Sequence, residues 1–158
     1  NIVSGETSPG LLQPGVALRI APVTADNKGV KAVTVTQNIY FAGIWIFNVH
    51  IWNSLDSKHP FTQIASFDLS PVVGSLIGSA APMVRSPWHV CARVVDRTFS
   101  FMIWTGTNPK PAWNDPRHVR TTTLPAGWDY SGYAGGYIGH LHDGQVGAFS
   151  GVETQVLP

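Results

Sequence analysis

The fold of this chain is decided by residues 87–106, which have the sequence Pro87-Trp88-His89-Val90-Cys91-Ala92-Arg93-Val94-Val95-Asp96-Arg97-Thr98-Phe99-Ser100-Phe101-Met102-Ile103-Trp104-Thr105-Gly106. Two alternating runs meet at Asp96-Arg97, the one break in the pattern, which is typical of a β-hairpin. With a turn there, one face is wholly apolar and carries Val90, Ala92, Val94, Phe99, Phe101 and Ile103. The other face carries His89, Cys91, Arg93, Ser100, Met102 and Trp104. A slip of one residue would mix the two faces, so the pattern predicts its own register and a sheet with one core face and one free face.

The composition indicates a single all-β domain. A chain of 158 residues is long enough to bury most of its apolar surface without a metal or a disulfide. Charged residues make up 12%, against roughly 25% in ordinary soluble domains. Glu occurs only as Glu6 and Glu153, and Lys is also scarce, whereas Val, Thr, Gly and Pro are abundant. Few helix-favouring residues beside many strand and turn residues favour β-structure.

The pattern along the chain predicts a sandwich of short strands preceded by a linker. Residues 1–15 are rich in Gly, Pro and Ser and are interpreted as an N-terminal arm, with the sandwich over 16–158. Besides the hairpin, we expect strands at 16–21, 30–36, 38–52, 62–69, 72–77, 121–124, 137–142 and 145–156. The run 38–52 would bend at Gly43, with core positions Phe41, Trp45, Phe47, Val49 and Ile51 and a mixed face of Tyr40, Asn48, His50 and Trp52. Asp143-Gly144 would be the turn of a C-terminal hairpin. Strands at this spacing are typical of a sandwich or a barrel.

A family resemblance rests on motifs in the second half of the chain. These are the hairpin strand with Arg93, the strand that ends in Trp104, the Pro111-Ala112-Trp113 loop, Leu124-Pro125-Ala126-Gly127-Trp128, and Gly136-Tyr137-Ile138-Gly139. In this order they resemble the C-terminal part of concanavalin A-like (lectin/glucanase) domains, in versions found in minor tail proteins of phages that infect actinobacteria. The first half matches in general texture only, and Cys91 departs from the pattern. The resemblance implies a two-sheet antiparallel jelly roll, a location in the virion and a role in attachment, but no catalysis.

Several classes of partner are disfavoured by the sequence. The net charge is +1 and basic residues are scattered singly, which argues against nucleic acid. No apolar run reaches the roughly 18 residues of a membrane span, so we expect no membrane insertion. Cys91 stands alone and is interpreted as a structural thiol. The first residue is Asn1 rather than Met, without a signal peptide, so we expect a processed piece of a longer protein.

Neither catalysis nor a cofactor is predicted. A retaining glycosidase needs two carboxylates about 5–5.5 Å apart, and no two acidic residues share a suitable spacing on one expected strand. A Ser-His-Asp site stays open, although no nucleophile elbow is present. His140 and His142 lie on one face of an expected strand, with the carboxylate of Asp143 following, and this geometry can bind zinc. A third ligand is not identifiable, however, and exposed histidines at a hairpin end are the competing interpretation. Calcium at Asp68, Asp129 or Asp143 is suggested only by the resemblance, since no acidic loop supports it.

Sugar binding is the sharpest positive prediction. Saccharides stack on exposed aromatic rings beside polar groups that bond their hydroxyls. The candidate ligand-binding residues are His50 and Trp52, if their strand joins the hairpin's sheet, Arg93 and Trp104 on the hairpin, and the loop aromatics Trp113, Trp128, Tyr130 and Tyr133. The competing interpretation is that these rings pack beneath loops. They could also form a protein interface anchored by Arg93 or Arg117.

Together these observations predict a non-catalytic adhesion domain of a phage tail, in the virion or outside the cell, that binds a host cell-surface glycan. Binding would be weak for each domain and strengthened by many copies. The alternative is a structural or decoration module that contacts other virion tail subunits, and a homo-oligomer is compatible with either. A glycan hydrolase is a third option, against which the missing acid pair argues.

Overall fold

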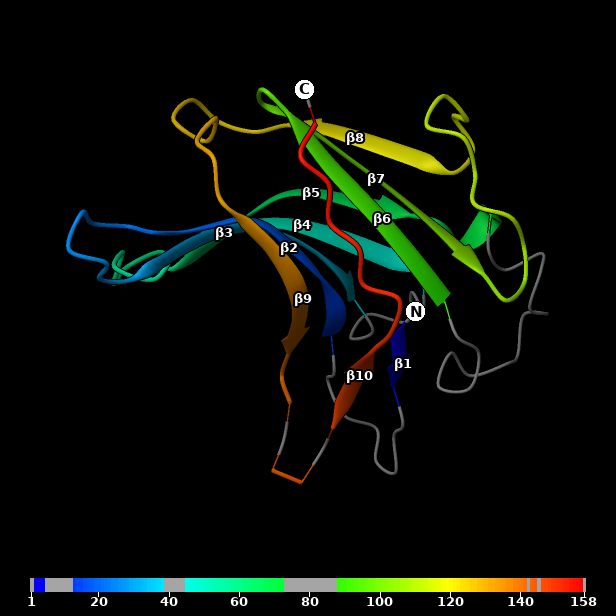
Figure 1. Ribbon diagram of the computed structural model, residues 1–158, viewed down its shortest axis with the longest axis horizontal. Helices are drawn as coiled ribbons and strands as arrows, with labels where there is room; N and C mark the ends of the chain where they lie inside the picture. Colours follow the sequence, from blue (N-terminus) through cyan, green and yellow to red (C-terminus); the bar gives the residue numbers. More distant parts are fainter. Residues whose placement is uncertain are drawn as a thin grey trace.

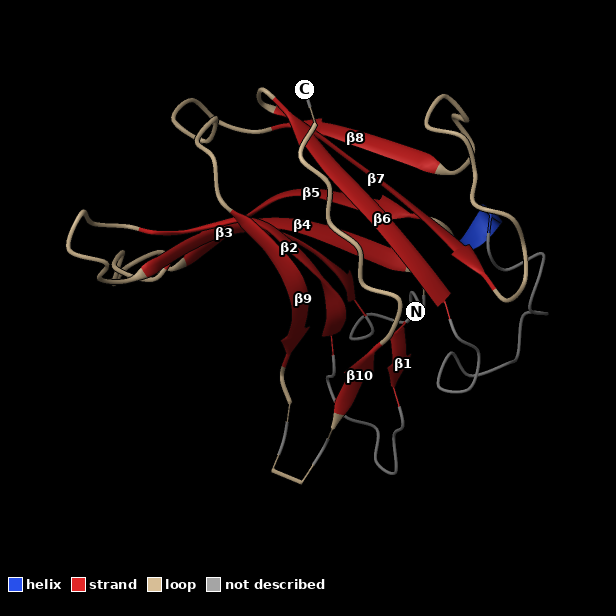
Figure 2. Ribbon diagram, viewed as in Figure 1, coloured by secondary structure: helices blue, strands red, loops and turns tan. Residues whose placement is uncertain are grey.

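The protein is a two-layered β-sandwich. The computed structural model describes residues 2–4, 13–38, 45–72, 88–141, 143–144 and 146–157. Within them, ten strands form two antiparallel sheets of five strands each (Figure 1). Helical structure in the described part is confined to residues 70–72, directly after β5 (Figure 2). The predicted all-β, two-sheet antiparallel sandwich is therefore confirmed.

The sheets are named A and B. Sheet A has the order β10-β1-β6-β7-β8, with β10 Gly147–Phe149, β1 Ile2–Ser4, β6 Trp88–Val95, β7 Thr98–Thr105 and β8 Val119–Thr123. Sheet B has the order β5-β4-β3-β2-β9, with β5 Phe61–Asp68, β4 Ile46–Asn53, β3 Val30–Asn38, β2 Gln13–Pro22 and β9 Tyr133–Gly139. The predicted strands at 16–21, 30–36, 62–69 and 121–124 correspond to β2, β3, β5 and β8, whereas most of 72–77 lies outside the described residues.

The β6–β7 hairpin has the predicted register. Val94 pairs with Phe99, and Ala92 pairs with Phe101. Phe99 and Phe101 are fully buried, as the alternation requires. Asp96 occupies the turn with φ 51°, a left-handed conformation that Asp adopts more easily than most residues. Local alternation and a short turn are thus sufficient to fix this part of the fold.

The predicted single strand over 38–52 is wrong. β3 ends at Asn38 and β4 begins at Ile46, and these two residues pair with each other in an antiparallel ladder. The chain therefore reverses between them, and residues 39–44, which include the predicted Tyr40 and Phe41, lie outside the described residues. The predicted core positions of β4 are confirmed, because Phe47 and Val49 are buried.

Aromatic side chains join the two sheets in the core. Phe47 of sheet B lies 5.4 Å from Trp88 and 5.8 Å from Phe101 of sheet A, measured between ring centroids. Phe67 of β5 lies 5.7 Å from Phe101. Val33 and other fully buried aliphatic residues fill the space around them. Each such side chain contributes about 1.5–3 kcal/mol by leaving water, so this cluster holds the layers together.

The chain ends differ from the sequence expectation. Residues 2–4, expected in the arm, form β1, which pairs with both β10 and β6, and β2 begins at Gln13. The predicted C-terminal hairpin is wrong, because β9 pairs with β2 in sheet B while β10 pairs with β1 in sheet A. The two strands pack across the sandwich instead. A Cβ at Gly136 of β9 would come within 3.0 Å of the Phe149 ring of β10, so this approach requires glycine.

One arginine connects both sheets at one end of the sandwich. The register of β2 shifts between Leu18 and Ala21, and Arg19 within this bulge has φ 54°. The Arg19 guanidinium donates to the carbonyl oxygen of Asp96 in the hairpin turn and to that of Trp128 in the β8–β9 connection. The bulge redirects this side chain out of the strand's alternation, as bulges commonly do.

Candidate functional site

The structure divides the predicted ligand-binding residues among three places. His50 and Trp52 lie on the outer face of sheet B, and the condition that they share the hairpin's sheet is not met. Arg93 and Trp104 lie on the outer face of sheet A, where Trp113 of the β7–β8 connection joins Arg93. The third place is the β8–β9 connection and the start of β9, with Trp128, Tyr130 and Tyr133. The contacts that the rings make with neighbouring side chains differ among these three places.

An aromatic stripe crosses the outer face of sheet B. We define the stripe as Phe61 of β5, Trp52 of β4 and Tyr137 of β9. The Trp52 ring lies 5.0 Å from Phe61 and 5.8 Å from Tyr137, measured between centroids. The strands between β4 and β9 present small side chains on this face, such as Thr34 and Ala17, which are direct neighbours in the ladder. Small residues there leave room for the larger rings to approach one another above the sheet.

Trp52 is held in place at the centre of the stripe. Its indole Nε1 donates a hydrogen bond to Thr34 Oγ1 at 2.8 Å. The His50 ring lies 6.1 Å from Trp52 and 5.8 Å from Phe61, between centroids. Aromatic pairs at such separations contribute about 0.5–1.5 kcal/mol each beyond area burial. The stripe is thus an ordered surface, formed before any ligand is bound.

Polar groups without partners lie on the same face. Asn48 pairs with Thr36, and both are buried together with His50. Thr36 Oγ1, Asn48 Oδ1 and His50 Nδ1 have no hydrogen-bond partner among the described residues. Burial lowers the pKa of His50, so its imidazole is neutral at neutral pH. Leaving a buried polar group unpaired costs about 1–3 kcal/mol, so an ordered water molecule or a functional role is needed to explain these three groups.

One end of the stripe is open to solvent. Phe61 is 52% exposed, and Gln63, which pairs with His50 and shares its face, is exposed as well. A ring and an amide are therefore presented side by side. A bulge in β5 produces this arrangement, because the pairing moves from Val49–Ala65 directly to His50–Gln63. The bulge turns Phe61 and Gln63 outward, although strict alternation with Ala65 would have pointed them into the core.

On sheet A, the predicted aromatic side chains pack against neighbouring side chains of the protein. Trp104 stacks on His89 at 4.9 Å with an interplanar angle of 9°, and the Arg93 guanidinium lies 4.1 Å from the Trp113 ring centroid. His89 Nε2 also contacts the carbonyl oxygen of Gly106 at 3.0 Å. These contacts favour the competing interpretation, in which the rings pack the β7–β8 connection onto the sheet.

The β8–β9 connection combines packed and exposed rings. Trp128 packs against the core and lies 5.8 Å from Tyr130. Lys31 Nζ lies 3.7 Å from the Tyr130 ring centroid, and burial raises the pKa of Tyr130 to about 12. Tyr133 is 80% exposed, without a ring contact to the other two. The three residues therefore do not form one surface.

The described part of the chain holds no cluster of metal-ligating side chains. No group of three or more His, Cys, Asp and Glu residues comes together there, and His142 of the suggested zinc site lies outside it. Cys91 is a half-buried free thiol. None of the described helical structure is long and apolar enough to cross a membrane.

Two of the three rings in the stripe, Phe61 and Tyr137, were not predicted as ligand-binding residues from the sequence. Phe61 precedes the predicted strand 62–69, and only the β5 bulge brings it to the outer face. Tyr137 reaches Trp52 because β9 pairs with β2, a long-range pairing that local alternation does not report. The Gly136-Tyr137-Ile138-Gly139 motif predicted a strand here but did not indicate which strand it pairs with.

No protein-family model, curated protein or solved structure matches this chain.

Proposed function

We propose that this protein is a non-catalytic glycan-binding domain that attaches a phage tail to the host-cell surface, and that the outer face of sheet B is its binding surface. The observation that carries the proposal is the aromatic stripe with the exposed Phe61 and Gln63 at its open end. The phage tail and its bacterial host come from the sequence resemblance. The residues of the site come from the contacts within sheet B.

The stripe and the neighbouring Gln63 together supply the aromatic and the hydrogen-bonding contacts that a saccharide needs. The C–H face of a sugar ring packs on an aromatic ring, whose face is the negative end of its quadrupole. Gln63 can donate to and accept from sugar hydroxyls, and it lies next to the exposed ring of Phe61. Such a shallow surface binds weakly in one copy. Several copies on one tail would gain avidity by raising the effective concentration of the second binding event.

A binding experiment with two single variants tests the proposal. The purified domain is incubated with intact actinobacterial cells and with their cell-wall polysaccharide fractions, both as a monomer and multimerised. Phe61→Ala removes an exposed ring from the stripe. Tyr133→Ala is the matched control, because it removes an exposed ring that lies outside the stripe. We expect saturable binding that Phe61→Ala abolishes and Tyr133→Ala retains. No binding by the multimerised domain, or equal loss in both folded variants, would refute the proposal.

A structural or decoration module of the virion is the second candidate. The observation that favours it is the exposure of two valines in the C-terminal segment, Val152 at 63% and Val156 at 93%. Exposed apolar side chains in one segment are typical of protein–protein contacts. Light scattering over a range of protein concentrations distinguishes the candidates. Self-association lost in Val152→Ser/Val156→Ser, together with an absence of glycan binding, would favour this second function.

A further inference from the structure

A second candidate site lies away from the stripe, at the open edge between β5 and β8. There a shallow hollow of about 520 Å³ is lined by Phe67, Trp113, Asn114, Asp115, Arg120 and Thr121, among others. Phe67 and Trp113 supply apolar walls, and the remaining four supply polar groups. A hollow with an aromatic wall and a few converging polar groups has the composition of a small-ligand site.

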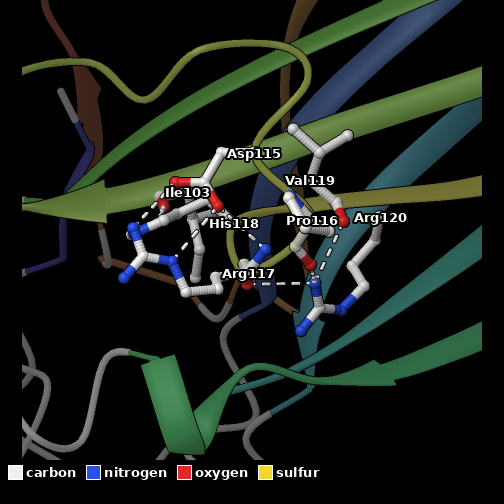
Figure 3. Close-up of polar contacts among 7 residues, drawn as sticks. All are labelled: Ile103, Asp115, Pro116, Arg117, His118, Val119 and Arg120. Atoms are coloured by element: carbon white, nitrogen blue, oxygen red, sulfur yellow. Dashed lines mark hydrogen bonds and ion pairs between the residues drawn. The ribbon is translucent and has the colours of Figure 1, made fainter.

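Arg120 is the fixed cation of this hollow. It pairs with the core residue Phe101, so its side chain leaves the edge strand toward sheet B. Its Nη1 lies within hydrogen-bond distance of three carbonyl oxygens, at 3.0 Å from Pro116, 3.0 Å from Arg117 and 2.9 Å from Val119, which share its two hydrogens (Figure 3). The guanidinium is therefore held in one position. Little side-chain entropy remains to be lost when a ligand binds to it.

The other edge of the guanidinium has no protein acceptor. Nε and Nη2 of Arg120 make no hydrogen bond to any described residue, and together they form the fork that matches a carboxylate or a phosphate. Asp115 lines the hollow, and hydrogen bonds from Ser70 and, to a smaller extent, the charge of Arg120 lower the pKa of Asp68, but both carboxylates also have other donors. Asp115 accepts from the backbone N–H of Arg117 at 3.0 Å and from its Nε at 3.3 Å, and Asp68 accepts from the backbone N–H of Ser70 at 2.8 Å.

The wall beside Arg120 is electropositive and aromatic. The Arg93 guanidinium lies 4.1 Å, and Lys110 Nζ 5.9 Å, from the Trp113 ring centroid. These two cations add positive potential next to the hollow. Asn114, on its rim, is exposed and can bond a hydroxyl. An anion attached to a hydroxylated ring would pair with Arg120 and bond Asn114 while its ring lies against Trp113.

We propose that the hollow binds an acidic saccharide, whose carboxylate or phosphate pairs with the free edge of Arg120 while the sugar lies against Trp113. The proposal does not depend on the stripe, because no residue of the stripe lines the hollow. Either site can therefore fail its test without affecting the other.

Nuclear magnetic resonance of the whole domain tests the inference. The Trp113 indole N–H resonance is followed during titration with D-glucuronate, with D-glucose as the neutral counterpart, and with glycerol 3-phosphate. We expect glucuronate or glycerol phosphate to shift this resonance with about tenfold higher affinity than glucose, because hydrogen bonds to charged groups are stronger than those to neutral groups. Added salt should weaken the binding. The stronger of the two acids identifies whether a carboxylate or a phosphate is preferred.

Three variants identify the group responsible. Arg120→Gln should lower the affinity about tenfold or more, and Arg120→Lys, which keeps the charge but not the fork, should also weaken binding. Lys58→Gln removes an equal charge from an exposed position outside the hollow and should leave the affinity unchanged. Equal shifts with glucose and the acids would overturn the proposal, as would wild-type affinity in Arg120→Lys. Arg120 would then be an inward-pointing charge that protects an edge strand from pairing with other chains.

Discussion

Replacement of Trp52 tests whether the stripe is an ordered surface. In Trp52→Ala, the hydrogen bond from Nε1 to Thr34 Oγ1 at 2.8 Å is lost together with the ring contacts to Phe61 at 5.0 Å and Tyr137 at 5.8 Å. In Trp52→Phe, the aromatic contacts are largely retained and the hydrogen bond alone is removed. The pair of variants therefore separates the polar contribution from the aromatic one.

The expected magnitudes follow from these contacts. A hydrogen bond of this kind contributes about 1 kcal/mol net, and each aromatic pair contributes about 1 kcal/mol. Trp52→Ala should thus lower the free energy of unfolding by about 3 kcal/mol, and Trp52→Phe by about 1 kcal/mol. In a domain of this size, 1 kcal/mol corresponds to about 2–4 °C in Tm. We therefore expect Tm to fall by roughly 6–12 °C in the first variant and 2–4 °C in the second.

Urea denaturation followed by circular dichroism measures both variants, and Thr34→Val is the control that removes the same hydrogen bond from its acceptor side. The double variant Trp52→Phe/Thr34→Val should be less destabilised than the two single changes taken together, because both remove one interaction. A loss below about 1 kcal/mol in Trp52→Ala, with full additivity of the other two, would refute the geometry assigned to the stripe.

Three further outcomes are expected. Gly15→Ala should destabilise by about 1–3 kcal/mol or more, because its Cβ would overlap the carbonyl oxygen of Val35; a neutral effect on urea unfolding would show that β2 can move. Tyr130→Phe should stabilise by about 1 kcal/mol by removing a buried hydroxyl without a partner, while keeping the ring beneath Lys31; a decrease in stability would reveal a partner for the hydroxyl. Burial lowers the pKa of His50 from 6.5, so below about pH 6.5 the unfolded chain takes up a proton that the folded chain resists. Stability should therefore decline as the pH falls from there to the lowered pKa, and His50→Gln should flatten this dependence.

The sequence predictions were accurate for contacts between residues close together in the chain and inaccurate for contacts between residues far apart in the chain. The β6–β7 register was predicted residue by residue, because alternation and a two-residue turn determine it locally. The break between β3 and β4 was missed, since the apolar run continues across it without a change in composition. The turn signal was sufficient at Asp96-Arg97, where both strands stay in one sheet, but not at Asp143-Gly144, where the strands on either side belong to different sheets.

The site was predicted only in part for the same reason. The outward direction of His50 and Trp52 follows from alternation in β4, and the structure confirms it. Phe61 faces outward because of a bulge, and Tyr137 meets Trp52 through strands far apart in the chain. Trp104 and Arg93 also face outward as predicted, but Trp104 stacks on His89 and Arg93 lies over the Trp113 ring. Which rings remain free for a ligand is a property of the packing between elements, which no local pattern encodes.

The bridge made by Arg19 has a consequence for how the sandwich opens. One guanidinium binds the hairpin turn at Asp96 and the β8–β9 connection at Trp128, so neither segment can leave the end of the sandwich without breaking a bond to the same side chain. Local opening there should be concerted, as in the cooperative units seen by native-state hydrogen exchange. Amides near Asp96 and Trp128 should share one opening free energy, and in Arg19→Ala they should exchange independently.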